Sequence, residues 1–292
     1  NALYGLQGMS SEHAEVRDLL RVLSVKVAAC KEELDAQAIG NALYGLQGMS
    51  SEHAEVRDLL RVLSVKVAAC KEELKAQAIG NALYGLSGLA KSGGHEVDRL
   101  VSHLLSCLSR NIHSISLSYS SDVYRSLTLL KFYRGESMSS ANALDRVDGL
   151  LVDLSNAAVS EYSGNPSNAQ LGSRTETRVA DEVNKYLLKR CPKATLTRNE
   201  MLQGFEADIV IRLPASESGE GDEGCRVVNI EVDGPSHQFP TKQTFTTRRD
   251  EYLTKQFGYS VHRLDINNMD MKQILKSVGP LLDGILFEKS KP

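Results

Sequence analysis

The stretch "RVVNIEVDGPSHQF", residues 226–239, is an apolar run that ends in two carboxylates. Its β-branched residues predict a buried strand over 226–232. Glu231 and Asp233 close the run, a Gly-Pro turn follows, and His237 stands just beyond the turn. Residues two apart in a strand point to the same side, so Glu231 and Asp233 are expected to share a face. Charge in such a strand is costly unless it is paired or used, which indicates a polar site.

The residues around this strand predict an α/β domain over 173–292, with elements in the order α-β-β-β-α-β-α. Its first helix begins at Ser173, which forms a capping box with Glu176. Before it, "SGNPSNAQLG", residues 163–172, is typical of a linker. The further elements are expected as strands over 194–198, 206–213, 226–232 and 259–265, and helices over 246–258 and 268–288.

A third carboxylate, Asp208, lies in the strand expected over 206–213. If that strand pairs with 226–232, Asp208 can meet Glu231 and Asp233. Three converging carboxylates suit Mg²⁺ or Mn²⁺, because hard divalent cations take oxygen ligands and can activate water against a phosphate. The sequence therefore predicts these three residues as metal ligands and catalytic groups. His237 is expected to orient a phosphate or to carry a proton.

Basic residues follow the acidic turn closely. Lys242, Arg248 and Arg249 are grouped in "TKQTFTTRR", where they could neutralise a phosphate backbone. The alternative is that they form only the solvated start of a helix. A second alternative concerns Glu231, which Arg248, Arg249 or Arg263 could pair in a purely structural network.

The N-terminal half of the chain is repetitive. Residues 1–40 and 41–80 have the same sequence except for Asp35 against Lys75, and a third copy begins at Asn81. A period of forty residues predicts stacked units of two helices. Because each pair of helices leaves one face apolar, the units are expected to stack into an α-solenoid over 1–162.

The first helix of a unit is expected over 51–70. Ser50 or Ser51 is the predicted N-cap, and apolar residues from Val56 to Val67 follow the three-four spacing of one buried stripe.

The second helix of a unit is expected over 31–47. Gly40 and Gly45 each cost this helix roughly 1 kcal/mol relative to Ala, which a closely approaching neighbouring helix would compensate. Gly48 is predicted to end the helix as its C-terminal cap.

The phrase "QAIGNALYGLQGM", residues 37–49, resembles the second helix of octotricopeptide-type repeats, which bind organellar RNA. The resemblance implies that Gln37, Asn41, Gln77 and Asn81 face the bases of single-stranded RNA. Two identical units would then prefer the same base twice. Alternatively, these polar residues only solvate one helix face. A solenoid is also compatible with binding a protein.

The C-terminal part also carries a resemblance. "NIEVDGPSHQF" followed by "RRDEYLTKQFGYSVHRLD" is similar to the RAP domain of organellar RNA-processing proteins, over roughly 171–270. That domain is related to the PD-(D/E)xK endonuclease fold. The resemblance therefore implies an α/β restriction-endonuclease-like domain and a mitochondrial or chloroplast location.

By position, Asp208 matches the first acid of the nuclease fold, Glu231 the second, and Glu176 the acid often found on its first helix. Asp233 stands where the motif lysine would be. Lys242 or Lys255 remains open as a substitute cation.

Composition excludes few function classes. The chain has 292 residues, 41% hydrophobic and 24% charged, and a formal net charge of -3. No apolar run approaches the ~20 residues of a membrane-spanning helix, so no membrane partner is expected. The chain begins without Met, which indicates a piece of a longer protein that lacks any targeting segment.

The function expected from these features is that of an RNA-binding factor for organellar RNA processing or stability. One alternative is a metal-dependent endoribonuclease. The other is a protein-binding adaptor with an inactive nuclease fold.

Overall fold

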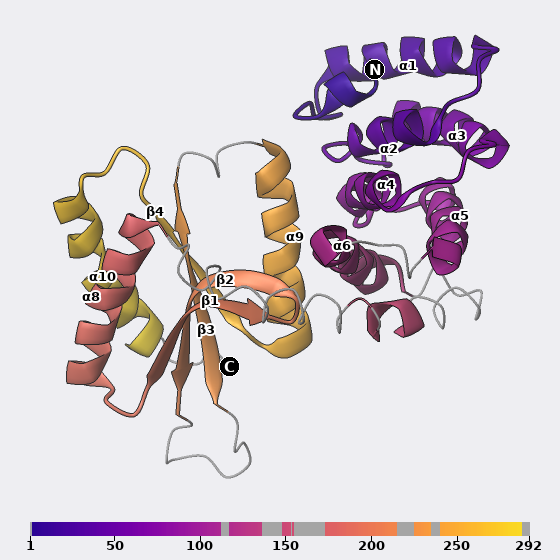
Figure 1. Cartoon of the computed structure of the whole chain (residues 1–292). Helices are drawn as coiled ribbons and strands as arrows, with labels where there is room; N and C mark the ends of the chain where they lie inside the picture. Colours follow the sequence, from indigo (N-terminus) through magenta and orange to yellow (C-terminus); the bar gives the residue numbers. More distant parts are fainter. Residues whose placement is uncertain are drawn as a thin grey trace. The chain divides into compact units, whose positions relative to one another are not determined.

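The computed structural model describes residues 2–111, 117–135, 148–152, 154, 173–214, 225–234 and 240–287. The chain divides into two compact units (Figure 1). The first unit contains Asn1–Gly164 and Phe239–Arg248, and the second contains Asn165–Gln238 and Arg249–Pro292. The predicted linker over 163–172 lies outside the described residues, so the boundaries at 162 and 173 stay predictions.

The first unit is helical. The helices α1, α3 and α5 pack in succession, and so do α2, α4 and α6 (Figure 1). Their bounds are η1 Tyr4–Leu6, α1 Ala14–Ala29, α2 Ala36–Tyr44, α3 Ala54–Ala69, α4 Ala76–Leu89, α5 His95–Asn111 and α6 Leu117–Arg134. Two helices per forty residues therefore agree with the predicted repeat unit.

The first helix of the repeat forms nearly as predicted, as α3. Its apolar stripe is buried from Val56 to Val67, each 1% exposed. The predicted serine cap is wrong, because the N-cap is His53 and makes no side-chain hydrogen bond. Ser51 is engaged elsewhere: its backbone N–H donates to Ser92 Oγ at 2.9 Å.

The second helix of the repeat begins later than predicted, at Ala36. The Asp35 carboxylate accepts a hydrogen bond from the Ala38 N–H at 2.6 Å and fixes the start of α2. Residues 31–35 therefore stay outside the helix. This is N-capping, in which a side-chain oxygen satisfies an N–H of the first turn.

The glycines of this helix permit the expected close approach. A Cβ added at Gly45 would collide with the carbonyl oxygen of Leu3, and one at Gly85 with that of Leu43. The prediction for Gly48 is wrong, because α2 ends at Tyr44 and its C-cap is Gly45.

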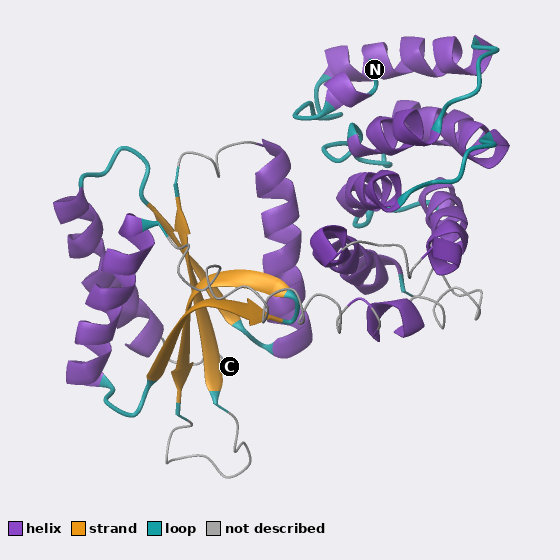
Figure 2. Ribbon diagram, viewed as in Figure 1, coloured by secondary structure: helices purple, strands orange, loops and turns teal. Residues whose placement is uncertain are grey.

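Within the described residues, the second unit contains four strands, the helices α8 and α10, and the part of α9 from Arg249 onward (Figure 2). The element order α-β-β-β-α-β-α is as predicted. The bounds are α8 Arg174–Arg190, β1 Thr195–Leu202, β2 Phe205–Leu213, β3 Arg226–Asp233, α9 Pro240–Phe257, β4 Ser260–Asp265 and α10 Met271–Phe287. The predicted capping box of Ser173 and Glu176 is confirmed at the start of α8.

The strands form one mixed sheet in the order β1-β2-β3-β4. The pairs β1–β2 and β2–β3 are antiparallel, and β3–β4 is parallel. Helices α8 and α10 lie side by side and pack on one face (Figure 1), where Ile211 and Ile230 belong to the core. Leu253 of α9 packs with Val210, which faces the opposite side of β2.

The protein is thus a run of helices followed by a small α/β domain with a four-stranded mixed sheet. This coarse order agrees with the predicted fold class. Within the described ranges, no helix is both long and apolar enough to span a membrane.

Candidate functional site

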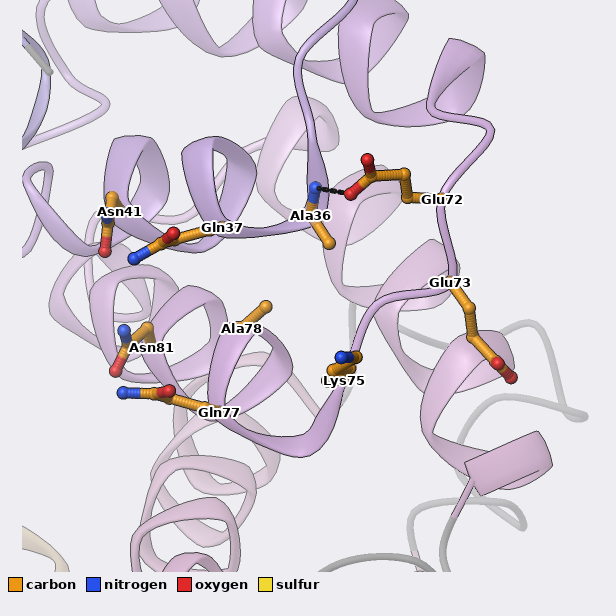
Figure 3. A pocket seen from close by; sticks show the side chains of 9 residues that line it. All are labelled: Ala36, Gln37, Asn41, Glu72, Glu73, Lys75, Gln77, Ala78 and Asn81. Atoms are coloured by element: carbon orange, nitrogen blue, oxygen red, sulfur yellow. Dashed lines mark hydrogen bonds between the residues drawn. The ribbon is translucent and has the colours of Figure 1, made fainter.

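A cavity of about 310 Å³ lies in the first unit and is lined by residues of α2, of α4 and of the segment that leads into α4. Figure 3 shows the four amide side chains on one side of the cavity and the charged side chains on the other. The lining residues are Ala36, Gln37, Asn41, Glu72, Glu73, Lys75, Gln77, Ala78 and Asn81. The structure therefore brings together all four residues that the repeat resemblance selects.

The repeat itself produces this arrangement. Gln37 and Asn41 are four residues apart, so they lie on one face of α2, and Gln77 and Asn81 occupy the same positions on α4. The two helices approach closely, since a Cβ at Gly40 would stand only 2.8 Å from the Ala78 Cα. Figure 3 shows the two glutamines and the two asparagines as parallel pairs.

These amides have unused hydrogen-bonding capacity. In the part of the chain that the structure describes, none of the four side chains makes a hydrogen bond to protein. Gln37 and Gln77 are exposed, and Asn41 and Asn81 are half-buried. Each amide offers one acceptor oxygen and two donor hydrogens, so the set can recognise a ligand with both kinds of group.

A column of tyrosines lies on the same helix face, three residues beyond each asparagine. Tyr4 stacks on Tyr44 with ring centroids 5.8 Å apart, and Tyr44 stacks on Tyr84 at 5.4 Å. The sequence reasoning missed this column. Its signal was the recurrence of tyrosine every forty residues, at a spacing of three from Asn41 and Asn81.

The other edge of the cavity is charged. A Glu72 oxygen accepts a hydrogen bond from the Ala36 N–H at 3.1 Å and so caps α2 from the next repeat. Lys75 is the N-cap residue of α4 and occupies the position that Asp35 holds at α2. Sequence reasoning noted this difference between the copies but did not place it at a site.

In the second unit, Asp208 and Glu231 come together as predicted. The register pairs Ile209 with Ile230, which sets Asp208 opposite Glu231 on the neighbouring strand. Asp208 Oδ2 accepts a hydrogen bond from the Val232 N–H at 2.8 Å. Burial, and then the nearby Glu231 charge, raise the pKa of Asp208 to about 7.

Glu231 is paired rather than open. Its carboxylate Oε2 lies 3.0 Å from Arg249 Nη2, and its Oε1 accepts a hydrogen bond from Asn229 Nδ2 at 2.7 Å. Arg249 also contacts Asp250 at 2.9 Å. Of the three arginines that could pair Glu231 structurally, Arg249 is therefore the one that does so.

Asp233 joins the same network from its other end. Arg263 Nη1 donates to Asp233 Oδ1 at 2.8 Å, and Arg263 Nη2 donates to Asp250 at 2.6 Å. The sequence reasoning missed Asp250, which links the two arginines. Alternating charges thus run from Glu231 through Arg249, Asp250 and Arg263 to Asp233.

The carboxylates as arranged do not fit a divalent cation. Two of the three predicted ligands, Glu231 and Asp233, already bind guanidinium groups. Within the described ranges, no group of three or more potential ligands gathers as a metal site. The Mg²⁺ or Mn²⁺ assignment stays a prediction that this geometry does not favour.

The side chains of two further predicted site residues are not described in the structure. His237 lies outside the described residues, and nothing is described of the side chain of Lys242 in the first turn of α9. Arg248 lies on α9 directly before Arg249, which is committed to the ion network. The predicted phosphate role of these basic residues stays a prediction.

The chain matches no family model, no curated protein and no solved structure. Both resemblances, to the octotricopeptide-type repeats and to the RAP domain, therefore remain predictions.

Proposed function

We propose that this protein binds single-stranded RNA through the cavity between α2 and α4. The observation that carries the proposal is the set of four amide side chains, without hydrogen bonds among the described residues, at equivalent positions of α2 and α4, which share the sequence AQAIGNALY. The two rows of packed helices support an α-solenoid as the scaffold of this surface.

Amide side chains suit base recognition. Each can donate and accept at once, which matches the paired donor and acceptor groups on the edge of a base. Sequence-specific RNA recognition uses unstacked bases, whose edges are open to such contacts. Because Gln37 and Asn41 recur as Gln77 and Asn81, the two repeats would select the same base at neighbouring positions.

The amide lining also favours RNA over a protein partner. An adaptor surface would carry a row of exposed apolar residues, whereas the side chains lining this cavity are mostly amides and charged groups.

In this proposal the second unit is a RAP-like domain of the endonuclease-like fold that holds RNA without cutting it. The ion pairs of Glu231 and Asp233 with arginines support the absence of cleavage. Its context would be the processing or stability of organellar transcripts.

A metal-dependent endoribonuclease is the second candidate. One observation favours it: Asp208 stands opposite Glu231 on adjacent strands, as paired acids of a nuclease would. A nuclease would require Arg249 to release Glu231 when metal and RNA bind.

The binding proposal is tested with labelled single-stranded homopolymers and fluorescence anisotropy. Asn81→Ala is expected to weaken binding to the preferred homopolymer by roughly tenfold, because a good amide-to-base pair contributes about 1–3 kcal/mol of discrimination. Asn is a weaker helix former than Ala, so this substitution leaves α4 intact.

Gln7→Ala is the matched control, because Gln7 is an exposed amide of the same unit outside the cavity lining. It is expected to bind as the wild type does. Equal affinity of Asn81→Ala and Gln7→Ala for every homopolymer would contradict base reading by the cavity.

A further inference from the structure

The first two repeats differ at one position, and in the second repeat that position lies in the cavity wall. Residues 1–40 and 41–80 differ only at Asp35 against Lys75, and Lys75 lines the cavity. At every other position of these copies, the same side chain recurs. Any difference in ligand charge preference built into the repeats themselves must therefore arise at this position.

Asp35 and Lys75 are the N-cap residues of α2 and α4, but their side chains make different contacts. Asp35 is used internally, because its carboxylate accepts the Ala38 N–H at 2.6 Å. The side chain of Lys75 caps no backbone N–H and makes no hydrogen bond or ion pair within the described parts of the chain. The ammonium of Lys75 is thus available to a ligand.

Lys75 is also the one cation among the lining residues. With Glu72 and Glu73, one positive and two negative charges give the lining a formal net charge of -1. Glu72 is held by the Ala36 N–H, and Figure 3 shows Glu73 extending away from the four amides. For an anion next to the amides, Lys75 is therefore the positive charge that the lining offers.

The spacing of Lys75 and Asn81 along the chain suits one nucleotide. Six residues separate Lys75 from Asn81, which is about 9 Å along a helix axis. That length is comparable with the reach from a phosphate to the base edge of the same nucleotide. A nucleotide whose base edge meets Asn81 can thus place its phosphate at Lys75.

We propose that Lys75 is the phosphate-binding residue of this cavity and that RNA crosses it with phosphates at Lys75 and bases toward Asn81. This inference rests on the proposed RNA-binding function and adds the position of the RNA backbone. The repeat with Asp35 then reads a base without binding its phosphate, so the two identical base sites differ in affinity.

The test is the salt dependence of binding to labelled single-stranded RNA, measured by anisotropy for the whole chain. For single strands, each phosphate contact contributes about 0.7 to the slope of log K against log salt. Lys75→Gln is expected to reduce that slope by about 0.7 and to weaken binding roughly five- to tenfold at low salt. Lys26→Gln removes the same charge from α1, outside the lining, and is expected to leave the slope unchanged.

Glu73→Gln provides an opposite test, since it removes a negative charge from the cavity wall and is expected to strengthen binding several-fold at low salt. If Lys75→Gln and Lys26→Gln give the wild-type slope while the wild type binds RNA, the position of the phosphate is overturned and the RNA-binding function stands. If the wild type binds no RNA at any salt concentration, both proposals are overturned.

Discussion

Glu231 and Arg249 form an ion pair that is almost closed to solvent, with 5% and 11% of their side chains exposed. Glu231 is the residue that the nuclease resemblance would make a metal ligand. Since a guanidinium binds its carboxylate from α9, the acid holds that helix to the sheet. The charge at the end of the buried strand is thus explained by pairing before any chemistry is invoked.

Breaking this pair is expected to destabilise the second unit strongly. Arg249→Met leaves Glu231 buried without its cation, which costs about 3–5 kcal/mol in the free energy of unfolding. Urea denaturation of the chain measures it.

Lys255→Gln is the control, because Lys255 pairs with Glu251 while 65% of the lysine side chain is exposed. An exposed pair contributes at most about 1 kcal/mol. Equal stability of the two variants would show that the buried pair does not hold α9.

Asp208 is expected to make stability depend on pH. Its raised pKa, about 7, means that between about pH 4 and pH 7 the folded state holds a proton that the unfolded state has lost. The contribution is therefore fully present below the unfolded pKa of about 4 and is lost as the pH rises toward 7. At higher pH the ionised, buried carboxylate opposes folding.

Asp208→Asn removes this titration and keeps an oxygen that accepts the Val232 N–H. Relative to the wild type, the variant is expected to gain stability between about pH 4 and pH 7, by up to about 1.4 kcal/mol per unit. Urea denaturation at several pH values measures it. A constant difference between the two proteins would contradict the raised pKa.

Two glycines of α4 are expected to respond in opposite directions to the same substitution. Gly85→Ala places a Cβ against the Leu43 carbonyl and is expected to cost about 1–3 kcal/mol. Gly80→Ala meets only Val123 Cγ2 at 3.5 Å, an ordinary contact, and is expected to gain up to about 1 kcal/mol. Thermal unfolding of both variants measures these opposite changes in stability. A stabilising Gly85→Ala would mean that α2 and α4 are farther apart.

The repeats provide a matched pair for burial. Leu59 is 0% exposed and Leu19, in the identical helix α1, is 40% exposed. Leu59→Ala is expected to lower the free energy of unfolding by about 2–5 kcal/mol. Leu19→Ala is expected to lower it by roughly half of that or less, because a partly exposed side chain buries less apolar area on folding. Urea denaturation compares the two variants. Equal losses of stability would contradict the different burial of these two leucines in α1 and α3.

The sequence predicted the parts of this structure that local pattern controls. Alternation and turn residues located the strands, and the acids of neighbouring strands met because β2 and β3 pair. Repetition predicted the two-helix unit, and Gly45 indicated a close contact before its partner was known. Each of these signals lies within a single element or recurs along the chain.

Features that depend on tertiary partners were missed. Ser51 is a good cap by composition, yet it bonds Ser92 in the next repeat, so His53 takes that position. Asp250 follows Arg248 and Arg249 in the middle of α9, and nothing local shows that it joins Arg249 to Arg263. The cavity needed the packing of α2 on α4, which periodicity alone does not determine.

The most direct test of the account is incubation of the chain with end-labelled single-stranded RNA in Mg²⁺, in Mn²⁺ and in chelator, with binding and cleavage read together. Glu231→Ala is run alongside. We expect binding in all three conditions and intact RNA, because the amides bind the RNA and the acids are paired with arginines. Metal-dependent cleavage that disappears in Glu231→Ala would contradict this and make the protein a nuclease.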